Sequence, residues 1–362
     1  MSSVAVYVGC AAGKSIDTFE LDPGTGTLSG HGRFQAGDEV QWLAPAPGGN
    51  MLYAAVRSDP PTVLSLHASG SSSALASSSG TRSALHLAGT APLAAPMAYL
   101  ATDGTGTRLL AASYNDDVVT VSGIEDGVAA GTRTAQVVPG RHAHTVLPSP
   151  DNKFVYTTAL GDDLTAWWGF DPATGNLDDG GTVASEPGSG PRHLRFSGSG
   201  SHIYVLHEMA GTITVFERDA GTGALTERQS VSSVPERLRL VPGRVRDGSV
   251  PTPGPDAIWC AELRLTPDNR FLYTTERSSS TITVFAVDGD SGLLSYLDTF
   301  PTETQPRGMN ITPDGQYLLA CGEVSNRLSV YQIEQSTGAL ALLDSYVCAA
   351  GPRCIEFSPE SA

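Results

Sequence analysis

One structural plan recurs along most of this sequence. It is clearest in residues 143–177, AHTVLPSPDNKFVYTTALGDDLTAWWGFDPATGNL. The segment reads as a short apolar strand, a Ser-Pro-Asp-Asn turn, two further strands containing aromatic residues, and a turn that ends in Gly and Leu. A recurring unit of this kind restricts the chain to repeat architectures. Helical periodicity is not apparent over any ten residues, so the pattern predicts an all-β fold.

Two kinds of turn mark the copies of the unit. The first kind occurs seven times, at residues 46–49, 102–104, 150–152, 197–200, 267–269, 313–315 and 358–360. The second kind combines an acidic residue with Thr or Ser, Gly and Leu, at residues 22–28, 171–177, 219–225, 288–294 and 334–340. Glycine at a fixed place supplies the positive φ that a tight hairpin needs. The unit is therefore a series of short antiparallel strands.

The spacing of the copies predicts the architecture. One turn position is occupied by Asp103, Asp151, Ser199, Asp268, Asp314 and Glu360, which are 48, 48, 69, 46 and 46 residues apart. A period in the mid-forties with four strands per unit is typical of a β-propeller blade. The last copy ends after its first strand, residues 354–357, and the chain begins with the missing strands, residues 4–8 and 15–21. We therefore expect one domain, residues 1–362, folded as a seven-bladed β-propeller whose last blade is shared between the termini.

Composition excludes several classes of partner. The formal net charge is −16 at pH 7, whereas nucleic acids and anionic membranes require a basic face. The first ten residues, MSSVAVYVGC, do not resemble a signal peptide, and no stretch is long enough to span a membrane. The five cysteines form no Cys-x-x-Cys motif and are interpreted as free thiols in a reducing cytoplasm. The protein is expected to be a monomer or a weak homo-oligomer.

Two segments break the repeat. A Ser/Ala/Gly-rich run lies between His67 and Pro96, where we expect a frayed outer hairpin at the rim of the ring. The 69-residue step leaves about 20 surplus residues, at 231–255, which contain Arg237, Arg239, Arg244 and Arg246. This insert connects an outermost strand to the innermost strand of the next blade. It is predicted to lie across or beside the mouth of the ring, with a place on the rim as the alternative.

Two positions in each repeat are expected to open onto the same mouth of the propeller. One position leads into the first strand of a blade, at Gln41, His144, Arg192, Ala261, Arg307 and Arg353. The other follows the second strand, at Arg57, Tyr114, Leu160, Glu208, Arg277 and Glu323. Their residue types vary while the surrounding strands keep their pattern, and local rules break most often at functional sites. A cluster of arginines on an acidic protein indicates a small anionic ligand, although ion pairing between blades could also explain individual arginines.

Five stretches also carry a resemblance to a known family. They are Gly-Pro-Arg-His at 190–193, Tyr-Val-Leu-His-Glu at 204–208, WCAELRLTPD at 259–268, FLYTTERSSSTITVF at 271–285, and Thr-Glu-Thr-Gln-Pro-Arg-Gly at 302–308. They resemble the seven-bladed lactonase family, which includes bacterial 6-phosphogluconolactonases and fungal carboxymuconate-lactonizing enzymes. The likeness covers the whole chain and is strongest from Tyr114 onward. The insert and the Ser/Ala run depart from the short bacterial members of that family.

The resemblance implies a set of site residues. The catalytic residues of the family fall on His144, Arg192, Glu208 and Arg277. Opening a lactone requires a base that takes a proton from water and donors for the developing oxyanion. Glu208 or His144 could be the base, and Arg192 and Arg277 the donors. Six further residues are expected to bind the substrate: Arg57, Arg307, Arg353, His193, Glu262 and Glu323. The forked guanidinium groups of the three arginines suit a phosphate or carboxylate.

The predicted activity is hydrolysis of a sugar-acid lactone, foremost 6-phosphoglucono-δ-lactone, without a cofactor. The alternatives are an aldarate- or uronate-derived lactone, a carboxymuconate cycloisomerase, and a protein-binding propeller with apolar residues at its mouth. His142 and His144 lie on one face of a strand, as zinc ligands can. No third ligand is paired with them in the sequence, so we expect no metal site.

Overall fold

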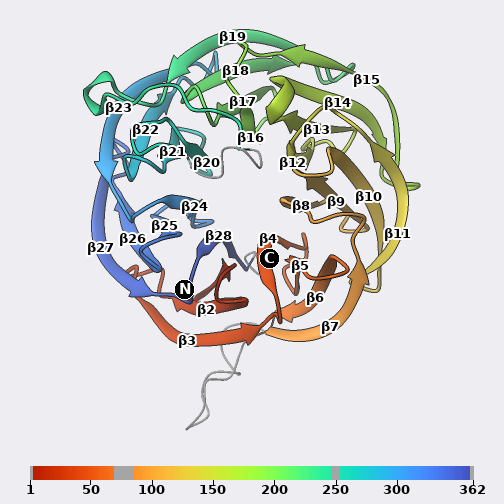
Figure 1. The fold of residues 1–362 in the computed structure, drawn as a ribbon. Coiled ribbons are helices and arrows are strands. Elements are labelled where there is room, and N and C mark those ends of the chain that lie inside the picture. Colours follow the sequence, from red (N-terminus) through yellow and green to blue (C-terminus); the bar gives the residue numbers. More distant parts are fainter. Residues whose placement is uncertain (1–2, 69–84, 247–252, 359–362) are drawn as a thin grey trace.

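A computed structural model gives the arrangement of residues 3–68, 85–246 and 253–358. Seven four-stranded antiparallel sheets surround a central axis, which confirms the predicted seven-bladed propeller (Figure 1). No α-helix occurs within these residues; two short 3₁₀ turns are η1 (Leu160–Asp162) and η2 (Glu236–Leu238).

The strands of each blade follow one another from the axis outward. From innermost to outermost, the blades are β28 (Pro352–Phe357), β1 (Val4–Cys10), β2 (Ser15–Leu21), β3 (Leu28–Gln35); β4 (Glu39–Pro45), β5 (Met51–Arg57), β6 (Thr62–Ala68), β7 (Leu85–Pro92); β8 (Tyr99–Thr102), β9 (Arg108–Ser113), β10 (Val118–Glu125), β11 (Val128–Val137); β12 (Ala143–Pro148), β13 (Phe154–Ala159), β14 (Leu164–Asp171), β15 (Asn176–Ala184); β16 (Pro191–Phe196), β17 (His202–His207), β18 (Thr212–Arg218), β19 (Leu225–Ser232); β20 (Cys260–Leu265), β21 (Phe271–Glu276), β22 (Thr281–Val287), β23 (Leu294–Pro301); and β24 (Pro306–Ile311), β25 (Tyr317–Gly322), β26 (Arg327–Ile333), β27 (Leu340–Val347).

The ring closes through a blade built from both ends of the chain. Strand β28 pairs antiparallel with β1, with Val6 opposite Phe357 and Gly9 opposite Cys354. A Cβ on Gly9 would lie 2.5 Å from the Cys354 sulfur, so only glycine allows the two strands to approach this closely. This pairing, expected from the split last repeat, leaves neither strand as an open sheet edge.

Burial decreases from the axis to the rim of each blade. In the β16–β19 blade, five of the six residues of β17 are buried, whereas one of the eight residues of β19 is buried. Blades therefore pack face to face through their inner and middle strands, and one core cluster joins Tyr204 and Val215 of this blade to Leu272 and Phe285 of the next. The five cysteines are buried and free. No helix within the described ranges is long and apolar enough to cross a membrane.

A repeated hydrogen bond ties neighbouring blades together. Four tyrosines occupy the third position of the second strand in their blades, and each donates from its hydroxyl to a glycine carbonyl in the outer turn of the following blade. The pairs are Tyr53–Gly127, Tyr156–Gly223, Tyr204–Gly292 and Tyr273–Gly338. All four glycines have positive φ. Three of these glycines, Gly223, Gly292 and Gly338, belong to the acidic-Thr/Ser-Gly-Leu turns seen in the sequence, which thus also provide acceptors at the blade interface.

The two irregular segments are placed differently. Strands β6 and β7 form the expected outer hairpin of the second blade, but residues 69–84 lie outside the described residues. The first residues of the insert, Val231 and Ser232, belong to β19, so the surplus begins two residues later than expected. Val241, within the insert, then forms an isolated bridge with Ala257, just after the insert ends.

Tyr204→Phe should lower the free energy of unfolding by about 1–2 kcal/mol, because it removes the donor and leaves the buried Gly292 carbonyl without a partner. Chemical denaturation of the two proteins measures this difference. Tyr296→Phe is the matched control, since that hydroxyl lies on an exposed outer strand and its loss should change stability by less than about 0.5 kcal/mol. Equal effects of the two substitutions would contradict the role of the interblade bond.

Candidate active site

An irregularity at the mouth end of the innermost strands aims their side chains at the axis. The strand register shifts at one residue in five of the seven blades, so that two residues oppose one on the partner strand. The extra residues are Gln41, His144, Arg192, Arg307 and Arg353. Such bulges bend a strand and redirect side chains, and they are frequent next to active sites. These five residues are among the six that the repeat predicted to lead into the first strand; at the sixth, Ala261, the register of β20 skips Ala261 and Glu262 together.

The second set of predicted positions ends the neighbouring strands. Arg57 is the last residue of β5, and Tyr114, Glu208, Arg277 and Glu323 immediately follow β9, β17, β21 and β25. Because first and second strands are antiparallel, the start of one and the end of the other reach the same face of the ring. The two sets therefore meet in space.

A cavity of about 770 Å³ lies at this meeting point. Its walls combine both sets with neighbouring residues: Glu39, Gln41, Trp42, Arg57, Ala98, Tyr114, Asn115, His142, His144, Arg192, Glu208, Arg246, Trp259, Arg277, Gln305, Arg307, Glu323 and Arg353. The four residues expected to be catalytic are together in it. Six arginines against three glutamates give the walls a formal charge of +3, in a protein of −16. The cavity suits an anionic ligand.

Glu208 holds the two central arginines. Its Oε2 lies 2.7 Å from Arg192 Nε and 2.7 Å from Arg277 Nη2, and all three side chains are at least nine-tenths buried. Burial by itself raises the pKa of Glu208, but the nearby arginines, Arg277 foremost, outweigh it and keep the pKa below its usual value. Glu208 is therefore a carboxylate that compensates two buried cations.

Each of these arginines retains one terminal nitrogen for a ligand. Arg277 donates from Nε to the Trp259 carbonyl at 3.0 Å and from Nη2 to the Cys260 carbonyl at 2.9 Å. Arg192 donates from Nη1 to the Ala261 carbonyl. Within the described part of the chain, Arg192 Nη2 and Arg277 Nη1 form no hydrogen bond or ion pair. Burial lowers the pKa of Arg277 to about 9, against the opposing charge of Glu208, so the side chain remains a cation at neutral pH.

His144 is a neutral imidazole among these cations. Its burial, together with the charge of Arg192, lowers its pKa well below the ordinary value of a histidine. Its Nδ1 is buried and has no hydrogen-bond partner among the residues that the structure describes. Tyr114 and His193 contact the ring at angles of 83° and 68°, which fixes its orientation.

A second group of charged residues lines the cavity near the start of β4 and the end of β25. Glu323 accepts a hydrogen bond from Arg353 at 2.9 Å and lies 3.6 Å from Arg307 Nη1. Arg353 also donates to Gln41 at 2.8 Å. Burial would raise the pKa of Glu323, but the charges of Arg307 and Arg353 lower it to about 2. Some arginines of the cavity therefore form ion pairs between blades, which was the alternative explanation for them. The cavity walls still carry an excess of positive charge.

The insert reaches across the mouth, as predicted. The Gly243 amide donates to the Met209 carbonyl at 2.8 Å, and Tyr114, from another blade, donates to the Arg246 carbonyl at 3.0 Å. The Arg246 guanidinium lies 5.0 Å from the Trp259 ring centre, and that of Arg277 lies 3.7 Å from it. Arg246 lines the cavity, whereas Arg244 is exposed and does not.

Comparison with known proteins identifies the family. The family model described as "Lactonase, 7-bladed beta-propeller" matches residues 5–357. The chain belongs to this lactonase family. It is 32% identical to the 6-phosphogluconolactonase of Cronobacter sakazakii over 313 residues, which cover 84% of this chain and 83% of that one.

Two further relatives show the range of the lactonase family. The 6-phosphogluconolactonase of an Enterobacter species is 32% identical over 235 residues, or 63% of this chain and 64% of the relative, so that match spans just under two thirds of its length. The periplasmic gluconolactonase of Pseudomonas aeruginosa superposes with a TM-score of 0.83 at 23% identity, covering 99% of both chains. At this identity the likeness shows the shared fold.

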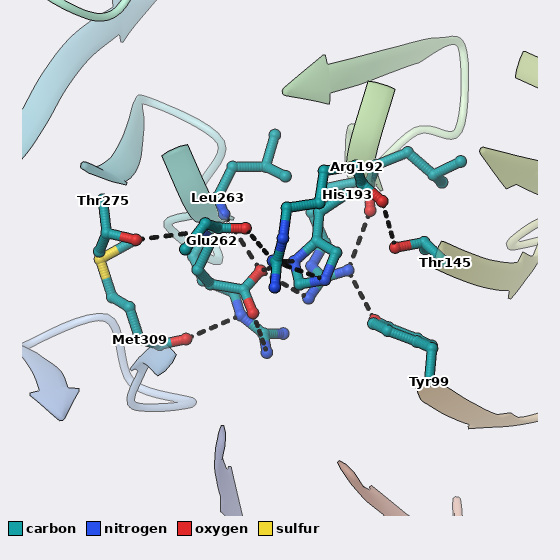
Figure 2. A network of polar contacts seen from close by, with 12 residues as sticks. Tyr99, Thr145, Arg192, His193, Glu262, Leu263, Thr275 and Met309 are labelled. Atoms are coloured by element: carbon teal, nitrogen blue, oxygen red, sulfur yellow. Dashed lines mark hydrogen bonds and ion pairs between the residues drawn. The ribbon is translucent and has the colours of Figure 1, made fainter. Parts of the chain in front are cut away.

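Two residues expected to bind the substrate lie elsewhere in this lactonase. His193 and Glu262 are fully buried, lie outside the cavity lining and are bonded to each other, with His193 Nδ1 3.1 Å from Glu262 Oε1 (Figure 2). In β16 the bulge explains the difference for His193, which follows the extra residue Arg192 and contacts Trp42, Tyr99 and His144 of other blades below the cavity lining. Arg57, Arg307, Arg353 and Glu323 do line the cavity.

The sequence also left some wall residues unassigned. Trp259 and Gln305 lie just before the innermost strands β20 and β24, and His142 stacks on Tyr114 with ring centres 4.3 Å apart. The sequence signal for them was weak: each lies two residues before a predicted mouth position. The structure describes no cluster of three or more His, Cys, Asp or Glu side chains suited to a metal ion.

Glu208→Gln should destabilise the protein by about 3–5 kcal/mol, because it leaves two buried arginines without their shared carboxylate. Inorganic phosphate should raise the thermal midpoint of this variant more than that of the wild type, since an anion can replace the lost charge. Glu217→Gln, which breaks an exposed pair with Arg228, serves as the control and should change stability by less than about 1 kcal/mol. Identical phosphate responses in wild type and Glu208→Gln would contradict the assignment.

Proposed function

We propose that the protein hydrolyses 6-phosphoglucono-δ-lactone to 6-phosphogluconate. The observation that carries the proposal is the pair of buried arginines held by one carboxylate beside a neutral histidine, in a cavity with excess positive charge. Membership of the lactonase family and the names of the Cronobacter and Enterobacter relatives support the same substrate.

Arg192 and Arg277 stabilise the oxyanion. When water attacks the lactone carbonyl carbon, negative charge develops on the carbonyl oxygen. Donors already fixed in a site of low dielectric stabilise that charge without rearranging. Arg192 Nη2 and Arg277 Nη1 are the nitrogens free for this contact, because Glu208 and backbone carbonyls fix the remaining nitrogens of both groups.

His144 is the base that activates water. It takes a proton from the attacking water as the C–O bond forms, and it returns that proton to the ring oxygen as the lactone C–O bond breaks. Glu208 is less suited, because protonating it would weaken its contacts with two arginines. The arginines that lower the pKa of His144 are countered by a bound anion. Substrate binding therefore raises this pKa toward the range in which a base is effective.

The phosphate binds to the lining arginines other than Arg192 and Arg277. Arg57, Arg246, Arg307 and Arg353 all line the cavity, and guanidinium groups bind phosphate through paired hydrogen bonds. A carboxylate satisfies the same geometry, so glucarolactone and galactarolactone are the appropriate competing substrates. Assays of all three lactones with the purified protein, corrected for spontaneous ring opening, test the proposal. A kcat/KM for 6-phosphogluconolactone no higher than for the dicarboxylic lactones would reject it.

The cytoplasm is the compartment we propose for the reaction. The five cysteines are buried free thiols, which is the usual state in a reducing compartment.

His144→Gln should lower kcat by roughly 10²–10⁴-fold, the range expected for loss of a general base. In the wild type, the acid limb of kcat/KM should fall well below pH 6.5, because the free enzyme holds His144 neutral, whereas that of kcat should lie at higher pH, because the bound anion raises the pKa. Stopped-flow pH profiles measure both limbs. An unchanged kcat in His144→Gln, with a large loss in Glu208→Gln, would assign the base to Glu208 instead.

Arg246→Ala should raise KM for 6-phosphogluconolactone about tenfold and change KM for uncharged gluconolactone much less, because the side chain contributes charge rather than shape. Arg244→Ala is the matched control: it lies two residues away in the same insert but outside the cavity, and it should leave both KM values unchanged. Equal changes for the two lactones would mean that Arg246 does not recognise the phosphate.

A further inference from the structure

Arg192 contacts the side chain of His193, which does not line the cavity. Its Nη1 lies 3.2 Å from His193 Nδ1 and 3.0 Å from His193 Nε2. In the plane of an imidazole, Cε1 lies between the two ring nitrogens, so an atom this close to both must lie above the ring face. The guanidinium therefore contacts the face of the His193 ring through Nη1, and arginine forms such contacts readily with flat rings.

The His193 ring is held from all sides. Trp42, Tyr99 and His144 contact it at angles of 79°, 74° and 68°, with ring centres 5.0–5.5 Å apart. In the ring plane, Glu262 Oε1 lies 3.1 Å from Nδ1 (Figure 2). Because the carboxylate can only accept, this contact places the proton of the neutral ring on Nδ1.

Glu262 is itself fixed on the neighbouring blade. Its Oε1 also accepts hydrogen bonds from Arg195 at 3.1 Å and from the Leu263 amide at 3.1 Å. The register of β20 skips both Ala261 and Glu262, between the pairs Cys260–Glu276 and Leu263–Thr274. This one irregularity presents the Ala261 carbonyl to Arg192 and the Glu262 carboxylate to His193.

The ring must be uncharged for this arrangement to work. Burial, with the charge of Arg192, lowers the pKa of His193 to about 3 although Glu262 opposes the shift. A neutral ring accepts a cation on its face, whereas an imidazolium would repel it. His193 thus supports Arg192 throughout the neutral pH range.

We propose that His193, oriented by Glu262, is a positioning residue for Arg192. The ring face supports Nη1, Glu208 holds Nε, and the remaining nitrogen, Nη2, is left for the oxyanion. The proposal rests on the proposed function for its catalytic consequence, but the positioning itself follows from contacts within the protein. His193 also contacts the ring of His144, so one side chain orients both a donor and the proposed base.

The test uses the space that Arg192→Ala vacates. Methylguanidinium should bind this variant, and calorimetry gives its affinity. In the Arg192→Ala/His193→Leu protein the affinity should fall about tenfold or more, whereas Arg192→Ala/His193→Phe should retain it within about threefold, since phenylalanine keeps a flat face of similar size. Circular dichroism and thermal midpoints confirm that each protein is folded.

Arg277→Ala is the matched control. Its guanidinium is held by Trp259, Cys260 and Glu208 and has no contact with His193. Adding His193→Leu to Arg277→Ala should therefore leave methylguanidinium affinity unchanged. Equal losses in the two arginine backgrounds, or no loss in either, would overturn the proposal.

If methylguanidinium binds neither Arg192→Ala nor Arg277→Ala, the kcat values of the single His193 variants test the proposal instead. His193→Leu should then lower kcat about tenfold or more with KM nearly unchanged, and His193→Phe should lose much less. Equal losses in kcat would overturn the proposal.

Glu262→Gln combined with His193→Leu should lower kcat by less than the product of the two separate losses, because Glu262 acts through His193. Absence of lactonase activity in the wild type would reject the proposed function, while the methylguanidinium affinities would still judge the positioning.

Discussion

The site depends on one carboxylate that compensates two buried guanidinium groups. Arg192, Glu208 and Arg277 come from β16, the end of β17 and the end of β21, so the contact joins two blades across their interface. Without Glu208, either arginine would be a buried charge without its counterion. With it, both can be held as cations whose remaining nitrogens face a ligand, and electrostatic stabilisation of this kind is commonly the largest contribution to acyl-transfer catalysis.

The propeller supplies this arrangement through a backbone irregularity repeated around the axis. A bulge at the mouth end of an innermost strand redirects the side chains beside it. In β16 these side chains are Arg192 and His193, and the result is a site in two layers. The upper layer contacts the cavity, and the lower layer, including His193 and Glu262, fixes the orientation of the upper one (Figure 2). Among the described residues, the insert adds Arg246 to the cavity wall that the repeats form.

Much of the fold and of the site could be predicted from the sequence, because equivalent positions in the repeated units can be compared with one another. Seven copies of a turn gave the blade count, and the split last copy gave the pairing of β28 with β1. Comparing equivalent positions then identified residues that open onto the mouth, and of the twelve positions only Leu160 and Ala261 are absent from the cavity wall. The assignment of His193 and Glu262 to substrate binding went too far, because a sequence motif shows that residues are close together without showing how deep each one lies.

By itself, the sequence determined the ring, its closure and the set of residues brought to one mouth. These follow from strand periodicity and turn chemistry, which are local properties repeated along the chain. Only the tertiary structure decided which charges pair, because pairing depends on distances between residues of different blades. Arg353 is committed to Glu323 and Gln41, Arg192 and Arg277 share Glu208, and Arg246 is brought in from the insert. The depth of each side chain also depends on the tertiary structure. At the bulge in β16, Arg192 lines the cavity and the next residue, His193, lies beneath it.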